Sequence, residues 1–491
     1  MFKTIKKTWP QDKDYPERTY RLSILSRVLD GTLYDNLPHA FHDEKTDAGE
    51  YIPLRSRRPS VRYGLCRLVV DDSVALLFSE GHFPEIDCGK GGEKTREALQ
   101  RIVKETALNA VMIDAATRGS VGSAAIMLRV LEGRVFFDVM ETANLTPTWK
   151  ATAPDTLEKV TEQYKVTGQS LKDSGYTVSD DDLQAEFWFM REWTAAQEAY
   201  YEPWKVVKDA TDKAPASPTL DASRTVTHKL GFVPVVWVKN LPGGDTTDGG
   251  CTFPDEAIDT GIEIDYQLSQ AGRGLKYSSD PTLLIKEPAY SDGTMVRSAS
   301  NAITVNEKGD AKLLEINGTA VTAVLEYVRG LRELALETMH GNRANADKIS
   351  AAQSGRAMEL MNQALIWLAD KLRISYGEGA LLSLLIMILK AADKIPLVFK
   401  DGTKVGKIEL PAGQQLALRW PAWYQPTASD MQQVAQTLQA LVNTGIISRQ
   451  TAIKVIAAQY DIEDTEAEFK LAEAERQARD AAAQRQVKVT E

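Results

Sequence analysis

The chain has 491 residues, of which 43% are hydrophobic and 26% are charged. These proportions are those of a folded protein and exclude a wholly disordered chain, a collagen-like fibre and a small disulfide-stapled module. Its 68 acidic and 58 basic residues give a net charge of −10, which excludes a protein that grips nucleic acid over its whole surface. The three cysteines are far apart, which argues against a disulfide framework or a structural zinc site and favours a reducing cytoplasm.

The first half of the chain predicts a mixture of helix and strand. Apolar spacing predicts helices over 15–35 and 93–117, separated by an irregular segment, 36–90, that is rich in Pro, Gly, His and Asp. Apolar runs predict two strand pairs and one further strand, at 124–131 with 134–140, at 185–193 with 198–205, and at 231–242. The polar segment 208–222 predicts an exposed loop.

The second half predicts mostly helix. Helical spacing covers 254–277, 319–339, 356–393 and the chain from 430 to its end. Strand-like pieces stand at 283–285, 302–305, 312–316 and within 395–420. Together the two halves predict an α+β fold.

Neither a secretory signal nor a membrane span is expected. The N-terminal sequence carries lysines with no apolar stretch behind them. The most apolar run, 380–389, has about ten residues, whereas a bilayer span needs about 20. We expect this run to be a helix buried in a large core or at a subunit interface.

Motifs typical of enzymes are incomplete. In GKGGEKT (89–95), Glu93 stands where a phosphate-binding loop requires glycine, and we expect no strand leading into it. GSVGSA (119–124) is not a nucleophile elbow, and the five histidines lack the spacing of a zinc protease. We therefore expect no enzyme, no metal and no cofactor.

The segment 443–460 has the outline of a DNA-binding helix-turn-helix, but it can also be read as two packed helices. Arg449, Gln450 and Lys454 are residue types that contact base edges, but the residues that follow are acidic. The pattern favours two packed helices with Ser448 as an N-cap.

Acidic residues gather on the helix predicted at 254–277. No basic residue precedes Arg273 there, and three of the acids recur at every fourth position; the acids are Asp255, Glu256, Asp259, Glu263 and Asp265. An ordinary solvated face is one interpretation, and a metal site is a weaker one. Repeated around a ring, the same face makes an acidic wall that does not bind phosphates and lets DNA slide.

The order of these parts resembles the portal proteins of tailed double-stranded DNA bacteriophages. Four segments carry the resemblance. They are the hairpin after a Gly-rich stop (119–140), the strand HKLGFVPVVWVKN (228–240), a long helix followed by SSDPTLLIK (278–286), and QSGRAM (353–358) before another helix. LRWPAWYQPTASDMQQVAQTLQAL (418–441) extends it, so that most of residues 90–475 is covered.

The resemblance implies a ring of about twelve subunits around a DNA channel at one capsid vertex. It implies a division of the chain into a wing (1–252 and 357–425), stem helices (253–280 and 319–341), a clip (281–318), a tunnel loop (342–356) and a crown with a helical tail (426–491). No role is assigned to residues 1–90. The clip would dock the packaging terminase and later the head–tail adaptor, and the ring would meet the major capsid and scaffold proteins. DNA would pass without sequence-specific binding, the virion would be the final location after assembly in the host cytoplasm, and no membrane would be involved.

The resemblance also implies roles for particular side chains. The small, polar tunnel loop would face the DNA, with two transient phosphate contacts from its basic residues; its candidates are Asn342, Arg343, Asn345, Lys348, Ser350 and Gln353. Asp255, Asp259 and Glu263 would line the channel or join stem helices of neighbouring subunits. Arg329 and Arg332 would pair with acids of the first stem helix, within or between subunits, or Arg329 with Glu333 on its own helix.

Two other classes of function remain open at this point. Another virion structural protein, such as a minor capsid component, would share this composition without forming closed rings. A metal-dependent nuclease using the acids at 255–265, or a nucleotide hydrolase, is the enzyme alternative.

Overall fold

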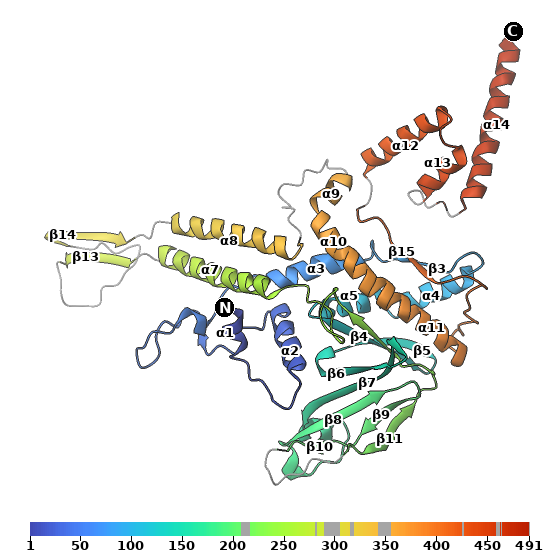
Figure 1. The fold of residues 1–491 in the computed structure, drawn as a ribbon. Coiled ribbons are helices and arrows are strands. Elements are labelled where there is room, and N and C mark those ends of the chain that lie inside the picture. The colour runs from blue at the N-terminus through green and yellow to red at the C-terminus, as the bar shows by residue number, and fades with distance from the viewer. Residues whose placement is uncertain are drawn as a thin grey trace. The chain divides into compact units, whose positions relative to one another are not determined.

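The computed structural model describes residues 1–207, 217–279, 282–288, 305–314, 319–341, 355–424, 427–457, 462 and 464–490 (Figure 1). The chain forms two compact units, 1–343 with 362–421 and 344–361 with 422–491. Helices and strands mix within the first unit and the second is helical, so the predicted α+β class is confirmed.

A three-stranded antiparallel sheet lies at the centre of the first unit. Its order is β12–β4–β5, with the strands at Val235–Lys239, Ser123–Leu131 and Arg134–Met140. The hairpin predicted at 124–140 is confirmed, and its turn residues Glu132 and Gly133 both have positive φ, at 51° and 78°. A turn with two positive φ values matches the right-handed twist of the strands it joins.

A larger sheet follows in the chain. Its strands run in the order β11–β9–β8–β7–β6, and β10 pairs with β8; their bounds are Leu145–Lys150 (β6), Ala153–Thr167 (β7), Glu186–Trp193 (β8), Gln197–Tyr201 (β9), Trp204–Lys205 (β10) and Leu220–Thr227 (β11). The pair predicted at 185–205 is confirmed, but β6 and β7 were not predicted. The loop predicted at 208–222 lies partly outside the described residues, and its end is strand β11.

The two sheets share one apolar core. Ala125 and Met127 of β4 and Trp237 of β12 belong to the same buried cluster as Val160 of β7 and Trp193 of β8. Burying an aromatic side chain of this size contributes about 2–3 kcal/mol. The core therefore fixes the larger sheet against the smaller one.

Helices surround the small sheet. They are α2 (Glu17–Leu29), α3 (Leu65–Phe78), α4 (Glu93–Glu105) and α5 (Leu108–Gly119). The expectation of irregular chain over 36–90 is wrong at α3, whose buried residues recur at helical spacing while Arg67 and Asp71 lie on its exposed side. The single helix predicted at 93–117 is two helices, because Ala107 adopts a left-handed conformation with φ 48° between them.

Shorter elements complete the first half. They are α1 (Phe2–Lys6), β1 (His39–Ala40), the 3₁₀ turn Leu54–Ser56, β2 (Arg57–Arg58), β3 (Glu85–Asp87), the 3₁₀ turn Thr142–Asn144, α6 (Gly168–Asp173) and the 3₁₀ turn Asp180–Asp182.

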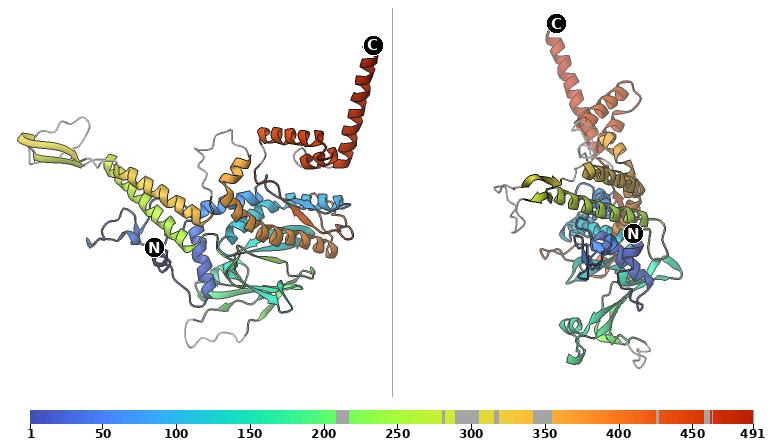
Figure 2. Two further views of the ribbon diagram at one scale, coloured as in Figure 1. Left: turned by 45° about the horizontal axis from the view of Figure 1, so that its top comes forward. Right: turned by 90° about the vertical axis from the view of Figure 1, so that its left-hand side faces the viewer.

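A long antiparallel hairpin projects from these layers within the first unit. Helices α7 (Asp255–Ser279) and α8 (Thr319–Thr338) lie side by side, and strands β13 (Thr282–Pro288) and β14 (Val305–Leu314) pair at their far end (Figures 1 and 2). Both helices and the strand at 283–285 were predicted. The predicted strand at 302–305 lies almost wholly outside the described residues, and that at 312–316 is described only to 314.

A continuous helical segment of 32 residues follows. It consists of α10 (Gln363–Leu372), a π-helical stretch (Arg373–Leu381) and α11 (Leu382–Lys394). By length and composition alone, this is the one helix among the described residues that is suited to cross a membrane. The apolar segment is therefore longer than the run of about ten residues predicted at 380–389. Tyr376, Ala380, Leu384 and Ile388 have no exposed surface, so the prediction of a buried core helix is confirmed.

The expectation of a β segment over 395–420 is mostly wrong. The described chain there holds one isolated bridge, between Val398 and Lys404, and one strand, β15 (Ala417–Arg419), which pairs with β3. In the second unit, α9 (Gly355–Met361), α12 (Ala428–Asn443), α13 (Arg449–Ile456) and α14 (Thr465–Thr490) agree with the predicted helices. Ser448 caps α13 by accepting the Thr451 N–H, as predicted.

Candidate functional site

The segment predicted to face DNA follows helix α8 in the chain and precedes α9. The predicted tunnel-loop residues all lie outside the described residues; they are Asn342, Arg343, Asn345, Lys348, Ser350 and Gln353. The chain leading into them is fixed, because Met339 and Gly341 are buried. A Cβ on Gly341 would lie 2.6 Å from Leu336 Cδ2 and 2.9 Å from Val69 Cγ2 of α3, so a larger residue here requires these two side chains to shift.

The acids of α7 meet the N-terminal residues of the chain. The Asp259 carboxylate accepts a hydrogen bond of 2.6 Å from the Phe2 N–H and pairs with the Met1 amine at 2.8 Å. Burial opposes the ionisation of Asp259, but these two hydrogen bonds outweigh it and hold its pKa below the ordinary value. Asp255 lies beside Lys6 and Arg21 around a cavity of about 320 Å³.

The predicted acidic face of α7 is therefore partly neutralised, because the Met1 amine and Lys6 of α1 bring positive charge to it. Glu263 instead accepts a hydrogen bond from Gln267 one turn along α7. Asp265 is not on that face at all, because it is buried and accepts hydrogen bonds of 2.7 Å from the Tyr34 hydroxyl and the Tyr63 N–H. Burial raises the pKa of Asp265 despite these bonds.

The two predicted arginines of α8 differ in their surroundings. Arg329 is exposed and forms no ion pair with Glu333 or with α7 among the described residues. Arg332 is half-buried, its Nε has no hydrogen-bond partner there, and its charge acts on Asp72 of α3. The intrachain pairings are thus not found in the described part of the chain, and pairing between subunits stays a prediction.

Large apolar side chains stand exposed on the same hairpin and on the core helix. Tyr327 and Leu334 lie on one face of α8, since seven residues are close to two turns, and Trp367 and Ile374 are exposed on the 363–394 helix. Where such side chains form a contiguous patch they mark a surface that contacts other proteins, which makes these two helices candidates for contact surfaces.

The glycine-rich segment at 89–95 does not form a phosphate site. The structure corrects one expectation, since the short strand β3 does lead into it. However, the Glu93 carboxylate accepts the Gly91 N–H at 3.2 Å, which is the kind of backbone donor that a phosphate would need. Among the described residues, no cluster of three His, Cys, Asp or Glu side chains suits a metal ion.

The N-terminal residues 1–63, which we call the N-terminal clamp, were assigned no role from the sequence. At one end the clamp contacts the larger sheet, where Lys165 of β7 pairs with Asp12 and Asp14, both at 2.6 Å, and the Tyr15 hydroxyl accepts the Lys165 N–H at 2.7 Å. The Tyr15 ring also packs edge-on against Trp188 of β8.

At its other end the clamp contacts α7 at three positions. The Tyr266 hydroxyl donates to the Arg57 carbonyl at 2.8 Å, the Ser269 hydroxyl accepts the Val61 N–H, and Arg273 pairs with Glu44. Between the two ends, Arg18 forms a bidentate pair with Asp248, just before α7. The clamp therefore links the larger sheet to the hairpin helix. The only sequence signal for it was the run of Asp, Arg and Tyr residues before position 65.

The buried side-chain amide of Asn240 also anchors the chain just before α7. Asn240 has no exposed surface, and its Nδ2 donates to the Gly250 carbonyl at 2.8 Å and to the Thr252 hydroxyl at 2.9 Å. Its Oδ1 accepts the Tyr376 hydroxyl at 3.2 Å. This network joins the start of α7 to the π-helical stretch of the core helix.

Comparison with known proteins places the chain in a family. The solved structures similar to it include a chain of "Virion of native gene transfer agent (GTA) particle", 11% identical with a TM-score of 0.35, and one of "Neck of empty GTA particle computed with C6 symmetry", 10% identical with a TM-score of 0.36; each match covers 80% of this chain and 88% of the other. No curated protein matches. The model of the family described as "Phage portal protein, SPP1 Gp6-like" matches residues 24–481. Because that match spans nearly the whole described fold, the chain belongs to the phage portal protein family and is a structural protein of the virion.

Proposed function

We propose that this portal protein forms a closed ring of about twelve subunits at one capsid vertex and that its channel carries the genome during packaging and ejection. The match of the family model over residues 24–481 carries the proposal. The exposed apolar faces of α8 and of the 363–394 helix support it, because a ring subunit needs two lateral contact surfaces.

The division of the chain follows the same proposal. Helices α7 and α8 are the stem, and the region 281–318 at their far end is the clip that docks the terminase and then the head–tail adaptor. Residues 342–356 are the tunnel loop, where Arg343 and Lys348 contact phosphates transiently. The rest of the first unit is the wing, 426–491 is the crown, and assembly with major capsid and scaffold proteins takes place in the host cytoplasm.

Mass photometry of the purified full-length chain, with negative-stain imaging of the same sample, tests the ring. We expect closed rings with a central hole and a mass near twelve times that of the subunit. A uniform monomer or dimer that persists at high concentration with scaffold protein present would overturn the proposal and favour a virion component that forms no ring.

A further inference from the structure

The described part of the second unit has no buried apolar core of its own. Among its described residues from 427 to 479, not one is buried. Nevertheless α12 carries an apolar stripe at Met431, Val434, Leu438 and Val442, which is the spacing of a helix that packs against other helices. A helical unit of this kind gains its stability from covering such a stripe.

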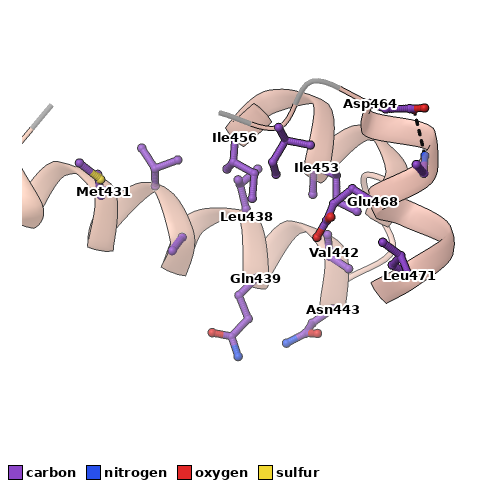
Figure 3. Close-up of a pocket in the computed structure, with 15 residues that line it drawn as sticks. Met431, Leu438, Gln439, Val442, Asn443, Ile453, Ile456, Asp464, Glu468 and Leu471 are labelled. Atoms are coloured by element: carbon purple, nitrogen blue, oxygen red, sulfur yellow. Dashed lines mark hydrogen bonds between the residues drawn. The ribbon is translucent and has the colours of Figure 1, made fainter. Parts of the chain in front are cut away.

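The stripe lines an open groove. Side chains of α12, α13 and α14 surround about 930 Å³, and Leu438 and Ile456 point toward one another across it, with Glu468 and Leu471 on the α14 side (Figure 3). The lining is mostly aliphatic, so an apolar side chain fits it better than a polar ligand does.

Two apolar side chains of the same unit are exposed outside the groove lining. They are Val455 on α13 and Ile446 in the turn before α13. Lys454 stands beside Val455, whereas Glu466 and Glu468 lie in the first turn of α14. None of these three charged side chains forms an ion pair with another residue of the described chain.

From these surfaces we propose that the occupant of the groove is the α13 outer face of a second copy of this chain, with Lys454 of one copy facing Glu468 of the next. A contact between two different faces is head-to-tail and repeats around a ring. This inference rests on the proposed ring. It adds that α12 and α13 acquire a buried core only on assembly.

Hydrogen exchange on the full-length chain tests the coupling to assembly. We expect the amides of α12 and α13 to exchange at least about tenfold more slowly in rings than in the subunit dispersed by dilution, while the amides of α5 exchange equally in both. Equal protection of α12 and α13 in the dispersed subunit would overturn the inference, because the groove would then be filled within its own chain.

Charge reversal tests the contact itself. Lys454→Glu alone and Glu468→Lys alone each place like charges at every crown contact, and we expect each to weaken association by about fivefold per contact. An equal mixture of the two variants should restore it, because an alternating ring again pairs opposite charges at every contact. Failure of the mixture to restore rings would overturn the proposed contact.

A second pair of variants tests the groove. Leu438→Asp should abolish the assembly-dependent protection of α12, while Gln436→Asp, on the opposite face of the same helix, should leave it unchanged. If the wild-type chain forms no rings at all, the proposed ring fails; if it forms rings with unprotected α12 and α13, only this inference fails.

Discussion

Arg18 and Asp248, which are 230 positions apart, form a bidentate ion pair at 2.7 and 2.8 Å immediately before the root of α7. The Asp248 carboxylate is almost completely buried and also accepts the Ser123 hydroxyl and Arg21. Arg18 donates in addition to the Thr142 and Leu145 carbonyls. This pair joins the N-terminal clamp, the small sheet and the hairpin at one point.

Removing the charge of Asp248 should destabilise the first unit strongly. Breaking a buried ion pair leaves the remaining charge uncompensated, so we expect Asp248→Asn to lower the free energy of unfolding by about 3 kcal/mol. Asp71→Asn is the matched control, since its pair with Arg67 is an exposed contact along one helix and should contribute no more than about 0.5 kcal/mol. Urea unfolding of the two variants checks this, and equal effects would contradict the role given to Asp248.

Asp265 and Asp259 should influence the pH dependence of stability in opposite directions. Burial raises the pKa of Asp265, so its contribution is present at low pH and is lost as the pH rises above 3.8 through the folded-state pKa. The hydrogen bonds from the N-terminus lower the pKa of Asp259, so its contribution is present above 3.8 and is lost as the pH falls through its folded-state value. The measurement is the unfolding midpoint of Asp265→Asn and of Asp259→Asn at several pH values. For each variant the difference in midpoint from wild type is plotted against pH, and we expect the two plots to have slopes of opposite sign.

The basic residues of the tunnel loop should affect DNA movement without affecting the ring. Changing Arg343 and Lys348 together to Ala removes two phosphate contacts per subunit, and we expect normal rings with packaging reduced several-fold. Lys90→Ala, in the turn before α4, is the control and should package normally. Normal packaging by a well-formed ring lacking 342–352 would show that this loop does not act on DNA.

Substitutions of the acids of α7 should have different effects, because these acids differ in their contacts. Glu263→Lys should leave ring assembly largely intact yet impede DNA passage, since positive charge in a channel retains phosphates. Asp255→Lys and Asp259→Lys should act differently, because they place positive charge beside Lys6 and Arg21 and beside the Met1 amine, respectively, and so loosen the N-terminal residues from α7. Loss of the rings in the Glu263 variant would instead identify this acid as an interface residue.

The elements with strong local patterns were predictable. Helices α7 and α8 have clear apolar stripes, and the β4–β5 hairpin combines continuous apolar strands with a Glu-Gly turn. Helix α3 was missed although its buried residues recur at helical spacing, whereas β7 was missed because Val160 is its only buried residue and the strand lacks alternation. For β7, pairing with its neighbouring strands rather than local periodicity decides the structure.

The candidate site was predictable only as a list of residue types. The i, i+4 spacing identified the acids of α7, but it could not show that Asp259 meets the N-terminus or that Asp265 is buried by Tyr34. These contacts join residues more than 200 positions apart, and no local pattern encodes such a separation. The clamp was missed for the same reason.

The long separations of the N-terminal clamp also determine when it can form. Asp259 and Asp265 contact residues 257 and 231 positions earlier in the chain. At a synthesis rate of about 5–20 residues per second, the first residues wait roughly 10–50 seconds on the ribosome before α7 exists. Every strand of the small sheet and of the larger sheet precedes α7 in the chain, since the last of them, β12, ends at Lys239. The clamp therefore closes only after α7 has been synthesised, and the hairpin obtains its fixed direction no earlier than that point in the chain.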